Sequence, residues 1–157
     1  MNAPIPRRVF SNSTIRRATV ADIDKFAAIA ENRYFGRNVR EAIPWVTWCV
    51  ENKAGDKFAW VGEDSFIIAH IYRQYGFELR VRVDILCTRP KKRAVLEAFQ
   101  LLKACKRWAA LNGVTHPLRL DADTGVDFGP FAKRLGGWQV DPKRYPVYEI
   151  PLDGGSL

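Results

Sequence analysis

The chain has 157 residues, of which 47% are hydrophobic, and a formal net charge of +8. It is long enough for one domain with a real core, and its apolar stretches are too short to predict a membrane span. The charge favours phosphate-bearing or acidic partners. The chain has three cysteines without paired spacing, Cys49, Cys87 and Cys105, which argues against a disulfide framework and predicts a cytoplasmic protein.

The N-terminal part predicts an arm, a short strand and two helices. We expect residues 1–12 to form a flexible basic arm, because they contain arginines but no apolar run of the kind found in a signal peptide. Residues 14–19 predict a strand. Apolar residues at helical spacing predict a helix over 20–34, and a second helix is expected over 39–51.

Three strands are expected next, over 58–61, 66–75 and 78–87, because these runs are rich in β-branched and aromatic residues and are separated by turns. Side chains alternate between the two faces of a strand. In the third strand, one face is therefore expected to hold Leu79, Val81, Val83, Ile85 and Cys87, and the other Arg80, Arg82, Asp84, Leu86 and Thr88.

The C-terminal part predicts one long helix followed by shorter elements. Pro90 suits a first helical turn, and apolar residues keep a 3.6-residue period as far as Ala109, before Asn112 and Gly113 end the helix. We then expect a strand over 118–122, a helix over 126–135, a strand or hairpin arm over 138–150 and a loose tail over 153–157. No linker or repeat interrupts 13–152, which predicts a single domain.

The segment between the third strand and the long helix is basic, with the sequence TRPKKRA over 88–94. The first N–H groups of a helix have no partner within the helix, and the helix dipole places partial positive charge at the same end. A strand that leads into a basic helix N-terminus therefore predicts an anion site.

The order of these elements resembles that of the GNAT (GCN5-related) N-acyltransferase fold, from Ile15 to Ile150. Residues 15–23 (IRRATVADI) resemble the opening strand and helix start of that family. Residues 89–94 (RPKKRA) occupy the place of its Arg/Gln-x-x-Gly-x-Gly/Ala pyrophosphate loop, and 131–138 (FAKRLGGW) resemble its closing Tyr-x-x-Leu-Gly-Phe motif. The resemblance implies an α/β fold with a central, mostly antiparallel, twisted sheet flanked by helices.

The resemblance also implies acetyl-CoA or another acyl-CoA as co-substrate, lying between two separated strands at 83–87 and 118–122. Backbone N–H groups of the 89–94 turn would hold the pyrophosphate, and backbone near Leu86 and Cys87 would pair with the pantetheine and polarise the thioester carbonyl. The implied cofactor-binding residues are Leu86, Cys87, Thr88, Arg89, Lys91, Lys92, Arg93 and Ala94. No metal is expected.

Two positions depart from the family pattern. Lys92 stands where the loop has its inner glycine, which the family uses so that backbone can approach phosphate closely. Ala132 stands where the family has its general-acid tyrosine. Tyr145 or Tyr148 of the last strand is the candidate replacement, which would protonate the leaving thiolate.

Asp84 is the best-placed candidate for the general base, with Glu78 second, because the resemblance places the base on the third strand. The alternative role of Asp84 is that of an ordinary charged residue that pairs across the strands. His70 is expected to be a structural imidazole, and His116 lies too far from it in sequence to indicate a metal site.

Two function classes follow. The first is an N-acyltransferase whose amine acceptor lies over the first two helices, where basic and aromatic residues predict an acidic or carboxylate-bearing substrate: Arg33, Tyr34, Arg37 and Arg40. The second is a catalytically silent GNAT-fold binding or assembly protein, which Lys92 and Ala132 favour. Such a protein would be similar to phage virion and accessory proteins, and it would then be associated with the virion. The positive net charge is also compatible with non-specific nucleic-acid binding, but the sequence contains no recognition motif for it.

Overall fold

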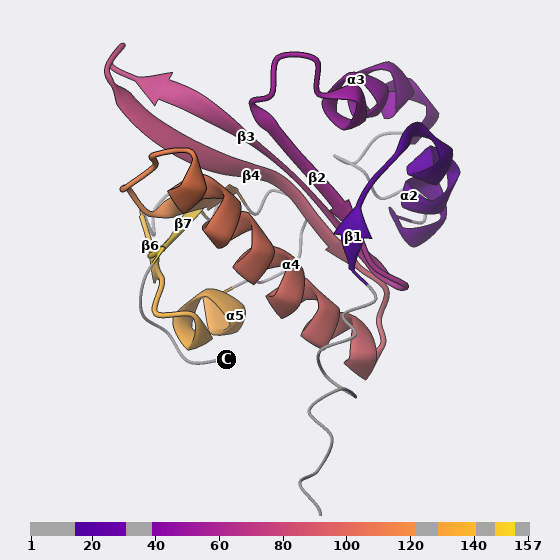
Figure 1. The fold of residues 1–157 in the computed structure, drawn as a ribbon. Coiled ribbons are helices and arrows are strands. Elements are labelled where there is room, and N and C mark those ends of the chain that lie inside the picture. Colours follow the sequence, from indigo (N-terminus) through magenta and orange to yellow (C-terminus); the bar gives the residue numbers. More distant parts are fainter. Residues whose placement is uncertain (1–14, 31–38, 122–128, 141–146, 153–157) are drawn as a thin grey trace, which may run out of the picture.

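Strands from the whole length of the chain form one sheet in the computed structural model, which describes residues 15–30, 39–121, 129–140 and 147–152 (Figure 1). The strand order in these residues is β1-β2-β3-β4-β5-β7-β6. The elements are β1 (Arg16–Arg17), η1 (Val20–Asp22), α2 (Ile23–Ala30), α3 (Val39–Glu51), β2 (Lys57–Val61), β3 (Ser65–Gln74), β4 (Glu78–Thr88), α4 (Lys92–Leu111), β5 (Leu118–Asp121), α5 (Gly129–Arg134), β6 (Trp138–Gln139) and β7 (Val147–Ile150).

Neighbouring strands are antiparallel throughout the described sheet except for β4 and β5, which are parallel. The mostly antiparallel sheet flanked by helices is therefore confirmed, as is the predicted order of elements. The ends of some elements differ from those predicted. The expected strand over 138–150 is a hairpin of β6 and β7, and the described part of the helix expected over 126–135 is α5 alone.

Helices cover both faces of the sheet and create two cores (Figure 1). On one face, α4 packs through apolar residues at helical spacing, among them Leu101, Leu102 and Cys105, which are fully buried. On the other face, α2 and α3 pack against the first strands of the sheet. There the rings of Phe26 in α2 and Phe66 in β3 stack with centroids 4.4 Å apart.

A bulge in β4 overturns the predicted alternation of its side chains. Ile68 pairs with Ile85 and Ala69 with Val83, so that Asp84 is the extra residue. Because an extra residue reverses the side-chain alternation beyond it, Ile85 packs against α2 and α3, whereas Leu86 joins the α4 core with Val83. The prediction that Ile85 and Cys87 share a face with Val83 was therefore wrong.

The outer edge of β2 is closed along most of its length. β1 pairs with Trp60 and Val61, and the Ala18 N–H donates to the Ala59 carbonyl at 2.9 Å. The Asn52 side chain completes the edge, because its oxygen accepts from the Lys57 N–H at 2.9 Å and its amide donates to the Lys57 carbonyl at 3.0 Å.

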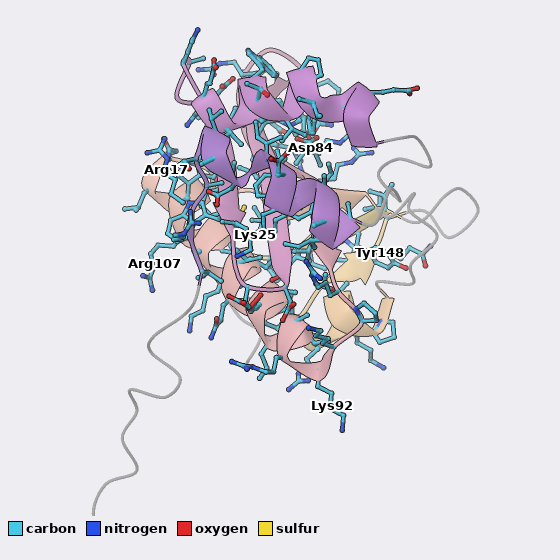
Figure 2. All side chains as sticks on the ribbon, turned by 90° about the vertical axis from the view of Figure 1, so that its right-hand side faces the viewer. Arg17, Lys25, Asp84, Lys92, Arg107 and Tyr148 are labelled. Carbon is cyan, nitrogen blue, oxygen red and sulfur yellow. The ribbon has the colours of Figure 1, made fainter. Side chains whose placement is uncertain are left out.

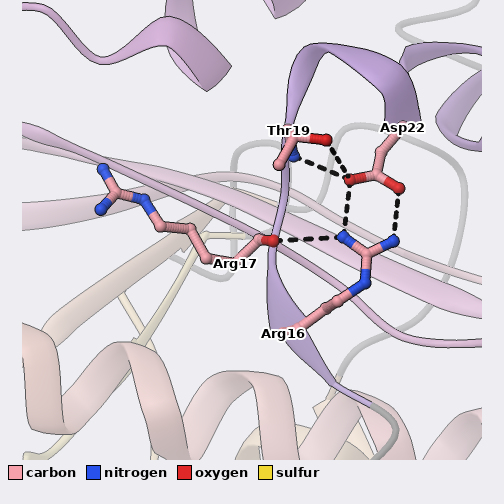
Figure 3. A network of polar contacts seen from close by, with 4 residues as sticks. All are labelled: Arg16, Arg17, Thr19 and Asp22. Atoms are coloured by element: carbon pink, nitrogen blue, oxygen red, sulfur yellow. Dashed lines mark hydrogen bonds and ion pairs between the residues drawn. The ribbon is translucent and has the colours of Figure 1, made fainter.

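The start of η1 is fixed by a bidentate ion pair (Figure 3). The Arg16 guanidinium donates to both oxygens of Asp22, at 2.6 and 2.8 Å, and the Thr19 N–H donates to the same carboxylate at 2.7 Å. These contacts, of which the bond from Arg16 is the largest, outweigh burial and lower the pKa of Asp22 to about 2. Figure 3 also shows that the Arg17 carbonyl accepts from Arg16, at 3.3 Å, whereas the Arg17 side chain is directed away from this network.

We expect Asp22→Asn to lower the free energy of unfolding by about 1–2 kcal/mol at pH 7, a value reduced for the exposure of Arg16. Because the folded-state pKa of Asp22 is depressed, its contribution is complete above the unfolded pKa of about 3.9 and is lost as pH falls toward about 2. Urea unfolding of both proteins from pH 7 downward measures this difference. A difference that stays constant over that pH range would contradict the assignment.

Candidate functional site

The two parallel strands at the centre of the sheet pair over a very short stretch. Their register consists of Arg82 with Arg119 and Val83 with Leu120. β4 continues past Val83 to Thr88 with β3 as its strand partner in the described residues, and the bulge at Asp84 lies where the pairing with β5 ends. Because a bulge bends its strand and increases the local twist, β4 turns away from β5 at this point, and no strand of the described residues pairs with this edge of β4 beyond Val83.

The turn from β4 into α4 ends in an exposed, basic helix start. α4 begins at Lys92, and its N-cap residue Lys91 has extended backbone and makes no side-chain capping hydrogen bond. Lys92 and Arg93 are exposed, and Figure 2 shows Lys92 pointing away from the body of the protein. Lys92 is also not among the described residues with positive φ, so this position needs no glycine for conformational reasons.

A buried glutamate fastens the β2–β3 turn to α4. The Glu97 carboxylate, 7% exposed, accepts hydrogen bonds from the Asp64 N–H at 2.8 Å, the Glu63 N–H at 3.1 Å and the Ser65 hydroxyl at 2.7 Å. A Cβ on Gly62 would lie 2.5 Å from the same carboxylate, so glycine is required for this close approach. This arrangement holds the turn beside the start of α4.

The β2–β3 turn places a carboxylate among the cations of the β4–α4 turn. Asp64 Oδ1 lies 3.5 Å from Arg89 Nε and 3.4 Å from Lys91 Nζ, and the Asp64 carbonyl accepts from the Arg89 N–H at 2.8 Å. Two of the predicted phosphate-binding side chains therefore already face a negative charge. Lys92 and Arg93 add two further exposed cations at the helix start.

A row of mostly polar side chains crosses the sheet beside the point where β4 and β5 separate. Each residue of this row pairs with the next across neighbouring strands. On β3, β4, β5 and β7, the residues directly before and after the row in sequence belong largely to the α4 core. The row therefore faces the opposite side, that of α2 and α3. It consists of Lys57, His70, Arg82, Arg119, Glu149 and Trp138.

His70 and Asp84 form a short polar contact on this face. His70 Nδ1 lies 2.6 Å from Asp84 Oδ2, with side chains 28% and 13% exposed, and Arg82 Nε lies 3.6 Å from Asp84 Oδ1. This pair goes undetected in the sequence when His70 is considered as an isolated residue. A hairpin that turns at Tyr75 and Gly76 brings His70 opposite Arg82, and this sequence signal could have revealed the pair.

The candidate acid lies on the other face of the sheet. Tyr148 is 5% exposed and belongs to the α4 core, as does Ala132 at 1%. Tyr148 would therefore reach a leaving thiolate from the α4 side. Four other predicted site residues lie outside the described residues: Arg33, Tyr34, Arg37 and Tyr145. Arg40 lies in α3, but its side chain is not described.

Two of the three thiols are buried. Burial, with a smaller contribution from the charge of Asp84, raises the pKa of Cys49 to about 12, and burial also raises the pKa of Cys105. Both cysteines therefore remain protonated at neutral pH and are poor nucleophiles. In the described parts of the chain, no three His, Cys, Asp or Glu side chains lie close enough together to hold a metal ion.

A groove of about 470 Å³ lies elsewhere, at the β1–β2 edge of the sheet, lined mainly by Phe58, Trp60 and Trp108 with Arg17 and Arg107. Arg17 and Arg107 lie on the opposite side of the molecule from Tyr148 in Figure 2. The groove is therefore separate from the β4–β5 site. No described helix is long and apolar enough to cross a membrane.

No protein-family model matches the chain, and no curated protein matches its sequence. Solved structures do match. The PaiA N-acetyltransferase from Thermoplasma acidophilum, in complex with coenzyme A, is 16% identical with a TM-score of 0.67, and the match covers 87% of this chain and 97% of that one. A GCN5-related N-acetyltransferase from Ralstonia eutropha is 18% identical with a TM-score of 0.62, over 82% and 93% of the two chains.

Arabidopsis thaliana NAA60 in complex with a bisubstrate analogue is 15% identical with a TM-score of 0.63, over 87% of this chain and 94% of that one. These matches span nearly the whole described chain and nearly the whole of each neighbour. Together with the sheet order and the parallel β4–β5 pair, they show that the chain has the GNAT fold. At this level of identity they show the fold alone. The resemblance to phage proteins gains no support from them.

Proposed function

We propose that this GNAT-fold protein is an N-acyltransferase that moves an acetyl or other acyl group from CoA to an amine. The observation that carries the proposal is the opening between β4 and β5 after Val83, with the uncapped, basic start of α4 at the end of the same strand. Such an opening offers strand backbone to a pantetheine chain, and such a helix start offers N–H groups and charge to a phosphate. The PaiA neighbour was solved with coenzyme A.

The residues around the turn fit a bound pyrophosphate. Arg89 Nε is buried and makes no hydrogen bond to another described residue, and its charge partner is Asp64 Oδ1 at 3.5 Å. Lys92 and Arg93 add exposed positive charge. The N–H groups of Arg89, Lys91 and Ala94 already donate within the protein, so we assign the pyrophosphate to the N–H groups of Lys92 and Arg93 with their side chains. We assign the pantetheine to the edge of β4 at Leu86, Cys87 and Thr88.

The acceptor side of the site favours an amine that carries an acidic group. The row across the sheet brings Arg82 and Arg119 beside the β4–β5 opening, and the Arg82 side chain is 47% exposed. Arg80 lies one row further and pairs with Glu78 at 3.3 Å and Glu149 at 3.7 Å. Guanidinium groups bind carboxylates well because their donors match the geometry of the two oxygens.

A titration with acetyl-CoA tests this proposal. We expect binding in the micromolar range, and we expect Lys92→Ala combined with Arg93→Ala to weaken it by about tenfold or more because charge-assisted contacts to phosphate are lost. The matched control is Lys103→Ala with Arg107→Ala, which removes the same charge from exposed positions further along α4. Calorimetry measures the dissociation constants. Equal effects of the two double variants would exclude the turn as the phosphate site.

A catalytically silent GNAT-fold binding or assembly protein is the second candidate. Two observations favour it: Ala132 occupies the position of the family's acid and is buried, and Asp64 faces Arg89 and Lys91 in the turn. Absence of binding at millimolar acetyl-CoA would support this candidate over the enzyme.

A further inference from the structure

We infer that His70 accepts the proton of the acceptor amine and that Asp84 is the positioning residue that orients it. This inference rests on the proposed acyl transfer. It revises the expectation that Asp84 itself is the base, and it starts from the 2.6 Å contact between His70 Nδ1 and Asp84 Oδ2.

The contact fixes which imidazole nitrogen carries the hydrogen. An ionised carboxylate can only accept hydrogen bonds, so Nδ1 of His70 must donate to Asp84. In a neutral imidazole the other nitrogen, Nε2, then keeps a free lone pair. Nε2 makes no hydrogen bond to another described residue, and the side chain is 28% exposed, so that a substrate amine can reach it.

The oxygens of Asp84 already face two partners, which leaves Nε2 of His70 as the acceptor of the pair that no described residue occupies. Oδ2 accepts from His70, and Oδ1 lies 3.6 Å from Arg82 Nε. A carboxylate held in this way can orient an imidazole and stabilise its protonated form, as the aspartate of a Ser-His-Asp triad does.

The position of the pair also fits a role in the transfer step. Asp84 is the bulged residue immediately after Val83, where β4 and β5 separate, and His70 lies on the neighbouring strand on the same face. A bulge next to a site re-aims a side chain. The pair therefore lies beside the opening assigned to the pantetheine chain, on the face that carries Arg82 and Arg119.

The charged and titratable groups around His70 come from three other elements. Asp84 and Arg82 lie on β4, and Lys57 lies opposite His70 on β2 next to Asp56. Lys57 is 7% exposed, bonds to Asp56 at 2.7 Å and lies 3.9 Å from the ring centre of Trp48 in α3. The hydrogen bond from Lys57, with a smaller contribution from His70, lowers the pKa of Asp56. The thiol of Cys49, also on α3, stays protonated.

The step that we assign to His70 balances as follows. The amine nitrogen attacks the thioester carbonyl carbon, the C–N bond forms and the C–S bond breaks. The proton lost by the nitrogen passes to Nε2 of His70, and CoA leaves as a thiolate that takes a proton from water or a nearby acid. His70 then returns its proton to water.

The first experiment tests the pair without any need for turnover. Long-range ¹H–¹⁵N spectra of the imidazole rings report which nitrogen is protonated, and His116, the other histidine, serves as the internal reference. His70→Gln assigns the signals. We expect His70 to have the hydrogen on Nδ1 and to lose this preference in Asp84→Asn. A neutral His70 with its hydrogen on Nε2 would overturn the inference.

The second experiment measures acyl transfer from acetyl-CoA to a panel of amino acids and other carboxylate-bearing primary amines. We expect His70→Gln to lower kcat by about 10²-fold or more with unchanged acetyl-CoA affinity, because proton transfer by a positioned side chain contributes about 10²–10⁴-fold. Added imidazole should partly restore His70→Ala. Asp84→Asn should lower kcat less, and the control His116→Gln should leave it unchanged.

The outcomes separate this inference from the proposed function. If His70→Gln transfers acyl groups to amines as fast as the wild-type protein, the role of His70 is overturned and the acyltransferase function stands. A wild-type protein that binds acetyl-CoA but transfers no acyl group overturns the role of His70 while the cofactor site remains. A wild-type protein that binds no acetyl-CoA overturns the proposed function itself.

Discussion

Glu97→Ala is expected to lower the free energy of unfolding by about 3 kcal/mol, because it leaves buried donors of the β2–β3 turn without an acceptor. The donors are the N–H groups of Glu63 and Asp64 and the hydroxyl of Ser65. For a chain of this size, that change corresponds to a fall in melting temperature of roughly 6–12 °C. The same variant should weaken acetyl-CoA binding, because Glu97 holds the β2–β3 turn in place beside the start of α4.

Two comparisons isolate the hydrogen bonds from the loss of a side chain on α4. Leu96→Ala changes the preceding residue, which is 57% exposed, and is expected to alter stability by no more than about 0.5 kcal/mol. Glu97→Gln keeps the shape and one acceptor oxygen, so its effect should lie between the two. Thermal unfolding with and without acetyl-CoA measures both stability and binding. Equal stabilities of Glu97→Ala and Leu96→Ala would show that the three contacts contribute nothing.

Phe66→Ala is expected to lower the free energy of unfolding by about 4 kcal/mol, the range found when a buried phenylalanine is removed and a cavity remains. The Phe66 side chain is fully buried and stacks on Phe26 with an interplanar angle of 8°. The variant therefore loses the contact by which β3 holds α2. Amides of α2 should consequently exchange with solvent faster than those of α4, which packs on the other face.

Phe77→Ala is the matched control, because it removes the same atoms from the β3–β4 hairpin tip, where Phe77 is 71% exposed. Its effect on stability should be within about 0.5 kcal/mol. Urea denaturation of the two variants gives the comparison. If Phe66→Ala were as mild as Phe77→Ala, the packing of α2 on β3 would have to differ from that described.

Much of the fold can be predicted from the sequence because its signals are local. The 3.6-residue period of α4, its end at Asn112 and the turn at Gly76 all depend on residues close together in the chain, and all are confirmed. The bulge at Asp84 has no such signal, since no glycine marks it, and the predicted faces of the residues after it were reversed for that reason.

The site is harder to predict because its contacts join distant residues. Asp84 and the basic turn were found as candidates from their positions on predicted elements. Glu97 contacts residues more than thirty positions away, and the pairing of Asp64 with Arg89 likewise depends on the packed structure. His70 was judged alone, although its role depends on the register of the β3–β4 hairpin.

The amide of Asn52 has a consequence for how this protein behaves at high concentration. An open strand edge is the usual template on which a second copy adds a strand and starts a growing intermolecular sheet. Asn52 occupies both backbone groups of Lys57, and the outermost strands β1 and β6 are two residues long. Aggregation of the native protein through the β2 edge must therefore begin with the release of Asn52.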